Sequence, residues 1–305
     1  MKHKIQLFIY FFLTINVTQA STEQSCAPIR TSLERLGAIR NQGVSGLCFA
    51  YEASDLVSYK LGFRVSAIDI AMSYLKSTQY NKMSDIYNNG GDTKPALAEA
   101  SRTGFCAESS MPSDEDRIDF SSEPHAKIFD SFMWLEKNSW DDPVGFKMAH
   151  DIFPKLTVNN FQAAVEQKKI RQRLSYLQQG ACKNRVPYSK MKFVHKLAQK
   201  PQQIIKLVQV INQQLENNNI VGIGFYSNDL YRSDLNIHTS DDDSHGTTLV
   251  ARRWNTEQNS CEYLMRDNFG AQCDLYQSGL DCKSGMIWVN EKFLLKNLFE
   301  VEYLE

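Results

Sequence analysis

The chain has 305 residues, of which 42% are hydrophobic and 23% are charged, and its formal net charge is -1. This length and composition predict a globular protein of one large or two smaller domains and exclude a disordered chain. The near-zero charge gives no basis for nucleic-acid binding, which depends on clustered basic residues that meet the phosphates.

The first 20 residues have the features of a secretory signal peptide. Lys2 and Lys4 precede the apolar run IQLFIYFFLTINV, and small residues follow up to Ala20. Because this run is shorter than the roughly 17 to 25 residues that span a bilayer, we expect cleavage rather than a membrane anchor. No Asn-x-Ser/Thr acceptor follows Ala20, which favours a bacterial source. The sequence thus predicts export to the periplasm or the extracellular space, with no membrane attachment after cleavage.

Seven cysteines follow the signal segment, at positions 26, 48, 106, 182, 261, 273 and 282. Disulfides form and persist in the oxidising compartments that an exported protein reaches. If six cysteines pair, one thiol remains as an intermolecular bridge, a buried spectator or a nucleophile. Parity alone does not identify that thiol.

The segment CFAYEASDLVSYKLG, residues 48–62, predicts a helix that begins at Cys48 and ends at a Gly62 cap. Its apolar residues recur at helical spacing: Phe49, Ala53, Leu56 and Val57. In VSAIDIAMSYL, Ser66 and Asp69 have the spacing of a capping box and predict a second helix. A Gly90-Gly91 turn follows, and then a short helix that ends at Gly104.

The composition divides the rest of the chain. Residues 21–111 form the helical left half, and residues 112–180 form an insertion or lid with an acidic run and one polar amphipathic segment at 158–179. Residues 181–305 form a strand-rich right half, in which a strong helical stripe precedes four strand-like runs. These runs are IVGIGFY, TTLVARRW, CEYLMR and MIWVN.

Cys48 is placed where a thiol becomes a useful nucleophile. The free N–H groups and the dipole at a helix N-terminus favour an anion and lower the pKa of a thiol there. Such a nucleophile still needs a base and an oxyanion donor.

The segment NQGVSGLCFA, with Cys48 in it, resembles the nucleophile segment of papain-like cysteine peptidases. Of the family pattern C-G-[SA]-C-[WY], it keeps the glycine and the nucleophile. The resemblance implies that Gln42 supplies the side-chain oxyanion donor, that Gly90 and Gly91 line the substrate cleft and that His245 is the catalytic histidine. The four residues from Asp267 to Gly270 stand where the family has Asn-Ser-Trp-Gly. All four elements occur in the family's order.

One family disulfide is missing as a pair, because Ser45 and either Asn88 or Asn89 occupy its two positions. This paired loss fits a diverged member better than a chance match. With Cys48 as the nucleophile, the other six cysteines are free to pair in fifteen ways. We expect Cys106 to pair with Cys182, which would close the insertion at its base.

The resemblance implies an α+β, papain-like fold with a helical left domain, a β-barrel-like right domain and the active-site cleft between them. It implies thiol-dependent hydrolysis of peptide bonds in a protein or peptide substrate, with no metal or organic cofactor and with a proteinaceous inhibitor as a further possible partner. Two alternatives stay open: an inactive member that binds peptides or partners, and a thiol amidase or transferase.

Two site assignments compete with neighbours in the sequence. His238 is the rival of His245 but lacks a following strand, and we interpret Asp241–Asp243 as a solvated loop rather than a metal site. At the third catalytic position, alignment without a gap favours Asp267. Asn268 would need a bulge, because a one-residue slip turns a strand residue to the opposite face.

Overall fold

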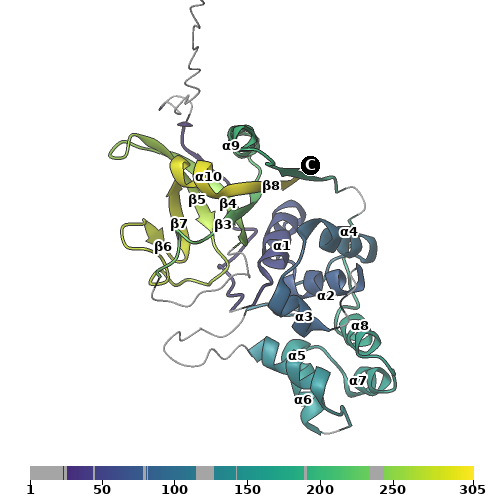
Figure 1. The fold of residues 1–305 in the computed structure, drawn as a ribbon. Helices are drawn as coiled ribbons and strands as arrows, with labels where there is room; N and C mark the ends of the chain where they lie inside the picture. Colours follow the sequence, from purple (N-terminus) through teal and green to yellow (C-terminus); the bar gives the residue numbers. More distant parts are fainter. Residues whose placement is uncertain are drawn as a thin grey trace, which may run out of the picture.

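The computed structural model describes residues 23, 26–43, 45–77, 80, 82–114, 127–141, 143–188, 191–233 and 244–305. The predicted signal peptide, His238 and the Asp241–Asp243 run lie outside these residues. The described chain forms helices on one side and a sheet on the other, in agreement with the expected α+β class (Figure 1). None of its helices is both long and apolar enough to cross a membrane.

Helix α1 lies between the sheet and the helices α2 and α4 (Figure 1). The first four helices are α1 (Cys48–Leu61), α2 (Ala67–Ser77), α3 (Met83–Asn89) and α4 (Thr93–Thr103). Every side chain of α1 from Phe49 to Tyr59 is buried, including the polar ones. The apolar residues of the predicted stripe are buried, but they do not account for all the buried residues of α1, because the sheet covers the other face of the helix. Gly62 ends α1 as predicted, with a φ of 75° and its N–H donating to the Ser58 carbonyl.

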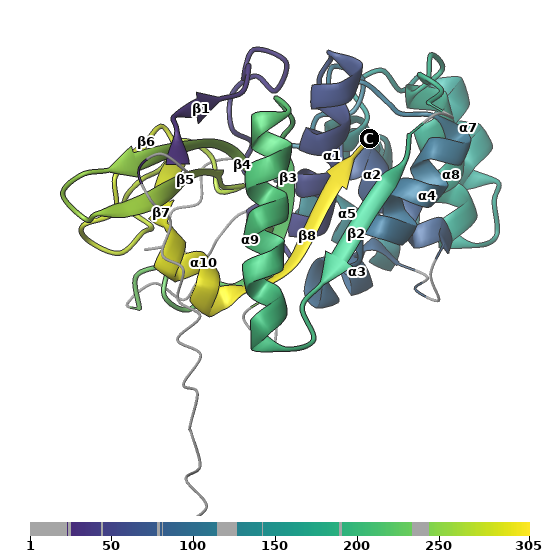
Figure 2. The ribbon, with the colours of Figure 1, turned by 90° about the horizontal axis from the view of Figure 1, so that it is seen from above.

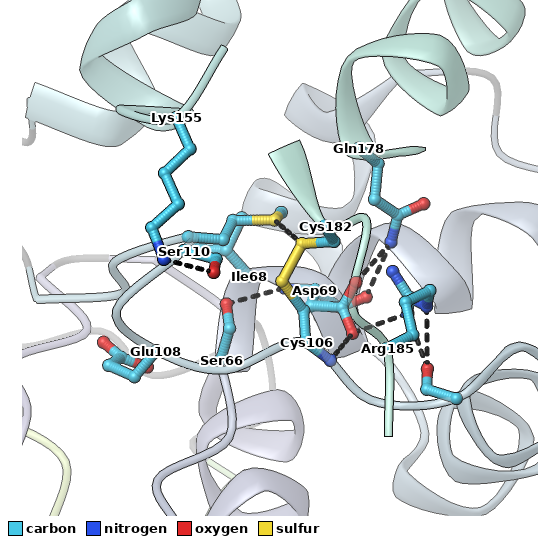
Figure 3. The surroundings of a disulfide bond; sticks show 12 residues. Ser66, Ile68, Asp69, Cys106, Glu108, Ser110, Lys155, Gln178, Cys182 and Arg185 are labelled. Atoms are coloured by element: carbon cyan, nitrogen blue, oxygen red, sulfur yellow. Dashed lines mark hydrogen bonds and ion pairs between the residues drawn. A yellow bond between two sulfur atoms is a disulfide. The ribbon is translucent and has the colours of Figure 1, made fainter. Parts of the chain in front are cut away.

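The capping-box prediction for α2 is half correct. Ser66 Oγ accepts from the Asp69 backbone N–H at 3.1 Å. The Asp69 carboxylate instead accepts from the Cys106 backbone N–H at 3.0 Å, from Gln178 Nε2 at 2.7 Å and from Arg185 Nη2 at 2.8 Å (Figure 3). Asp69 of α2 therefore binds both Cys106, which precedes residues 107–177, and Gln178, which follows them.

Helices α5 to α8 continue the core of the helical half. They are α5 (Lys127–Lys137), α6 (Pro143–Ile152), α7 (Val158–Val165) and α8 (Ile170–Ala181). Helix α5 packs on α3 and α8 packs on α2, and buried Phe132 and Trp140 belong to the same cluster as α1 and α2. The single segment expected at 158–179 is two helices, and Arg173 Nε binds the free Gln167 carbonyl between them.

The sheet has the strand order β2-β8-β3-β4-β5-β7-β6, with β1 paired to β4, and its neighbours are antiparallel. Its strands are β1 (Ile29–Arg30), β2 (Phe193–Leu197), β3 (Val221–Tyr226), β4 (Ser244–Asn255), β5 (Ser260–Arg266), β6 (Cys282–Lys283), β7 (Met286–Asn290) and β8 (Leu298–Leu304). The four predicted strands are confirmed as β3, β4, β5 and β7. Strands β2 and β8, which pair with each other beside α1, were not predicted (Figure 2).

Two helices pack on the sheet: α9 (Pro201–Glu216) and α10 (Glu291–Asn297). The predicted stripe of α9 is confirmed, because Leu207, Val208, Ile211 and Leu215 are buried in a second core with β3, β5 and β7.

The N-terminal segment runs along the sheet before it reaches the helices. β1 pairs with β4, and a disulfide joins Cys26 to Cys261 of β5. Further along, the Gln42 N–H donates to the Asn268 carbonyl at 2.7 Å. The start of the range 21–111, which we expected in the helical half, thus lies on the sheet.

A buried ion network joins the two halves. Asp55 of α1 accepts from Arg266 Nε of β5 at 2.8 Å and pairs with Arg40 of the N-terminal segment. Arg40 also pairs with Glu108 at 3.1 Å. Burial opposes the charge of Asp55, but Arg266 and then Arg40 outweigh burial and lower the pKa of Asp55. The network therefore holds Asp55 ionised at the contact between α1 and the sheet.

We expect Asp55→Asn to lower the free energy of unfolding by about 3 to 5 kcal/mol, because it leaves buried arginine charge uncompensated. Denaturant titration at pH 7 measures this loss. Asp151→Asn is the matched control, because Asp151 pairs at 3.0 Å with an exposed Lys147 and should change stability by at most about 1 kcal/mol.

The pH dependence follows from the lowered pKa of Asp55. A lowered folded pKa stabilises the native state above the unfolded pKa, and this stabilisation is lost as the pH falls through the folded value. The difference in the free energy of unfolding between wild type and Asp55→Asn should therefore shrink below about pH 4. Equal losses for Asp55→Asn and Asp151→Asn would contradict the assigned role.

Candidate active site

The nucleophile segment lies against the predicted glycine turn. The Gly46 N–H donates to the Tyr87 carbonyl at 2.7 Å, and a Cβ on Gly46 would lie 2.8 Å from the Gly90 nitrogen. A Cβ on Gly91 would lie 2.6 Å from the Tyr74 ring and 2.7 Å from the Phe49 ring. Only glycine allows these close approaches. The structure therefore brings Gly90 and Gly91 beside the start of α1.

Cys48 is the first residue of α1, is partly exposed and carries a free thiol. The other six cysteines form three disulfides: Cys26–Cys261, Cys106–Cys182 and Cys273–Cys282. The expected Cys106–Cys182 bond is confirmed and joins the two ends of the segment that carries α5 to α8 (Figure 3). The cysteine left without a disulfide partner is thus Cys48, at the N-terminus of α1.

His245 and Asp267 meet where two neighbouring strands come together. His245 is the second residue of β4, and Asp267 directly follows β5. His245 Nε2 and Asp267 Oδ1 are 2.8 Å apart, and both side chains are completely buried. His245 Nδ1 is also buried and has no hydrogen bond of good geometry to the described residues. This nitrogen is therefore the one left for a reaction partner.

Asp267 is fully supplied with donors. Its Oδ1 accepts from the Asn268 backbone N–H at 2.8 Å as well as from His245. Its Oδ2 accepts from the hydroxyls of Tyr231 at 2.9 Å and Tyr276 at 3.0 Å. Burial disfavours the carboxylate, but His245 and these donors outweigh burial and lower the pKa of Asp267. Burial and then Asp267 raise the pKa of both tyrosines well above the usual value, so both remain O–H donors.

His245 is held in its protonated form. Burial lowers its pKa, but the charge and hydrogen bond of Asp267, followed by the hydrogen bond and charge of Cys48, raise the pKa of His245 to about 10. The Cys48 thiol is therefore close enough to act on the imidazole.

Asn268 does not reach the imidazole. Its Nδ2 donates to the Gly246 carbonyl at 3.2 Å, on a different side of the strand end from Asp267. Phe269 stacks on the His245 ring with centroids 5.4 Å apart and planes 14° from parallel. Of the two residues left open by the sequence, the structure places Asp267 against His245.

Gln42 is buried beside the nucleophile segment. Its Nε2 donates to the Ser45 carbonyl at 2.8 Å, which uses one of its two amide hydrogens. The second hydrogen remains for another acceptor. Gln42 is held in place by its own N–H, which donates to the Asn268 carbonyl.

Three aromatic residues around His245 were not predicted. Phe225 of β3 and Tyr231 make edge contacts with its ring, at 5.6 Å and 6.1 Å between centroids, and Tyr276 lies beside Tyr231. Nothing in the sequence pattern distinguishes these residues, because aromatic side chains are common both in strands and in turns. Together with Phe269 they keep water away from the His245–Asp267 pair.

Comparison with known proteins gives structural likeness only. No protein-family model matches the chain, and no curated protein matches its sequence. Among solved structures, the proform of the ragweed pollen allergen Amb a 11, a cysteine protease, is similar at 13% identity over 96% of this chain and 68% of the other, with a TM-score of 0.48. PepW from Lactobacillus is similar at 13% identity over 90% of this chain and 81% of the other, with a TM-score of 0.47. SERA5E from Plasmodium falciparum is similar at 11% identity over 88% of this chain and 90% of the other, with a TM-score of 0.46. At these scores the likeness alone establishes no activity.

The disulfides predict the outcome of an alkylation experiment. When the chain is unfolded without reductant and treated with iodoacetamide, we expect one label per molecule, on Cys48, because the other six sulfurs are bonded. Peptide mass spectrometry locates the label, and prior reduction should raise the count to seven. Cys48→Ser should take no label without reductant. Two or more labels on the unreduced wild type would mean that a disulfide is missing.

Proposed function

We propose that this chain is a papain-like cysteine peptidase that hydrolyses peptide bonds. The observation that carries the proposal is the buried His245, which is bonded to Asp267 through Nε2 and has its pKa raised by both Asp267 and Cys48. A histidine orienter, a base and a free thiol at a helix N-terminus are the parts that nucleophilic catalysis by cysteine requires. The likeness to a cysteine protease agrees with this proposal but does not carry it.

Cys48 attacks the substrate carbonyl as a thiolate. Because Asp267 binds Nε2, the imidazolium presents its proton at Nδ1 and delivers it to the leaving amine. The product of this step is a thioester on Cys48. His245 Nδ1 then takes a proton from water as the water attacks the thioester, the acyl group leaves as the carboxylic acid product, and Cys48 is released as the thiolate beside protonated His245.

The oxyanion that forms during attack needs donors placed in advance. The backbone N–H of Cys48, at the start of α1, and the second amide hydrogen of Gln42 supply them. Gln42 is held from both sides, by Ser45 and by Asn268, and so does not need to reorganise as the charge develops. Gly90 and Gly91 leave space for an extended substrate backbone next to the nucleophile.

We further propose that the enzyme acts after export, with the first 20 residues removed. Three disulfides support an oxidising compartment. The division into residues 21–111, 112–180 and 181–305 stays a prediction, with the middle segment packed into the core of the helical half.

Replacement of either reactive residue tests the proposal. Cys48→Ala and His245→Ala should each lower the turnover of a fluorogenic peptide mixture by about 10³-fold or more, because the two residues act as one unit. The double variant should lose little more than either single one. His150→Ala, on α6, removes an imidazole elsewhere and should retain wild-type turnover. A Cys48→Ala protein that cleaves at a comparable rate would overturn the assignment.

The same proteins separate the two alternatives from a peptidase. An inactive member would leave Cys48 slow to react with an epoxysuccinyl reagent, whereas the proposed thiolate reacts rapidly with one equivalent. An amidase would release ammonia and a transferase would form crosslinks on a denatured protein substrate. The proposed peptidase generates new amino termini instead.

The charge of Asp267 predicts a shift in the pH profile. Asp267 raises the pKa of His245, so that Asp267→Asn should lower that pKa and move the alkaline limb of kcat/KM down by about one pH unit or more. An asparagine can still accept from His245 Nε2 and donate to a tyrosine hydroxyl, and so the fold should persist.

Asn268→Ala is the control for this profile. This variant loses the hydrogen bond to the Gly246 carbonyl, which should lower the free energy of unfolding by about 1 to 3 kcal/mol. The alkaline limb of its kcat/KM profile should stay at the wild-type position. If Asn268→Ala cripples turnover and Asp267→Asn leaves the limb in place, Asn268 is the residue that orients His245.

A further inference from the structure

Three carboxyl groups and an imidazole come together at the contact between α1 and the sheet, one helical turn along α1 from Cys48. His195 on β2 lies directly opposite Glu302 on β8, and Glu300 lies two residues along β8 on the same face. Glu52 comes from α1, which packs on β8 (Figure 2), and its carboxyl group lies near that of Glu302. We call these four residues the interface cluster.

The spacing of the interface cluster suits a metal ion. One ligand atom each from His195, Glu300 and Glu302 lies within 4.8 Å of the others. His195 Nε2 contacts Glu300 Oε1 and is 4.0 Å from Glu302 Oε1. Nitrogen and oxygen ligands bind Zn²⁺ at about 2.0 to 2.2 Å, so that two ligands of one ion are at most about 4.4 Å apart. Only small side-chain movements separate His195, Glu300 and Glu302 from that geometry.

The sheet leaves room for these carboxyl groups through glycines. A Cβ on Gly222 of β3 would lie 2.0 Å from Glu52 Oε1, and one on Gly246 of β4 would lie 2.6 Å from Glu52 Oε2. A Cβ on Gly224 would lie 2.8 Å from Glu300 Oε2. Any side chain at these positions would displace a carboxyl group. The glycines of IVGIGFY therefore have a use that the strand pattern alone did not indicate.

Two carboxyl groups of the interface cluster are almost completely buried. His195 Nε2 is the described nitrogen that lies beside Glu300 and Glu302. Glu52 and Glu302 are each only 3% exposed. Glu52 Oε1 and Glu302 Oε2 are buried and have no hydrogen-bond partner in the described part of the chain.

Two buried carboxylate oxygens without donors are the atoms that a cation would satisfy, because an unpaired buried polar group is costly. We propose that His195, Glu300 and Glu302 bind a divalent transition-metal ion of the Zn²⁺ class. One imidazole and two carboxylates suit such an ion, and three protein ligands leave a fourth position, on the side of Glu52, for water or a further oxygen ligand. The ion joins strands β2 and β8 where β8 packs on α1.

Zn²⁺ binding to the full chain tests the site, with Cys48→Ala as the parent so that the catalytic thiol does not compete. Isothermal titration calorimetry should show one Zn²⁺ per chain, and the ion should raise the melting temperature, because it binds the native state. X-ray absorption of the loaded parent should show nitrogen and oxygen ligands and no sulfur.

His195→Gln and Glu300→Gln, made in the parent, should each weaken Zn²⁺ binding at least tenfold and abolish the rise in melting temperature. Both side chains are 21% exposed, so that these changes are tolerated better than changes at Glu52 or Glu302. His150→Ala is the matched control and should bind as the parent does. Absence of Zn²⁺ binding to the parent, sulfur ligands in its spectrum, or binding that neither variant weakens would overturn the proposal.

Discussion

The ion pair between Asp55 and Arg266 is the constraint on which the site depends. It joins two residues 211 positions apart, one on α1 and one at the end of β5, and both are buried. Two charges that are removed from water must keep their geometry, because each depends on the other for compensation. The pair therefore sets how α1 and the end of β5 lie relative to each other. Arg40 pairs with the same carboxylate of Asp55 and so attaches the N-terminal segment to α1.

The catalytic geometry follows from this contact. Arg266 precedes Asp267, so that the residue that locates β5 on α1 stands next to the residue that binds His245. On the other side, Asp55 is seven residues, close to two helical turns, after Cys48. The proposed nucleophile and the orienting carboxylate are thus positioned through one pair of charges. The hydroxyls of Tyr231 and Tyr276 complete the support by holding the second oxygen of Asp267.

One face of α1 carries the polar contacts between the two halves. Cys48, Glu52 and Asp55 follow one another at intervals of four and three residues and so share a face of the helix. That face meets His245, then the interface cluster, then Arg266. A helix buried along its length would ordinarily present apolar side chains to a sheet. Here the polar residues face polar groups of the sheet, and two carboxyl oxygens of the interface cluster are left without a hydrogen-bond partner in the described part of the chain.

The sequence by itself determined the local elements and which thiol is a candidate nucleophile. Helical spacing with a glycine cap predicts α1 with Cys48 at its start, strand-like runs predict β3, β4, β5 and β7, and odd parity predicts one free thiol. These features depend on residues near one another in the chain. The class of fold and the candidates His245 and Gln42 came instead from the resemblance of short segments to papain-like cysteine peptidases.

Only the tertiary structure decided what those residues touch. Asp267 and Asn268 are neighbours whose roles depend on which way each side chain faces at the strand end, and a shift of one residue exchanges the faces. Tyr231 is 36 residues from Asp267, and Asp55 is 211 from Arg266. Strands β2 and β8 exist as a pair because each supplies the other's hydrogen bonds. No local sequence pattern predicts these contacts, because they form only when distant segments pack together.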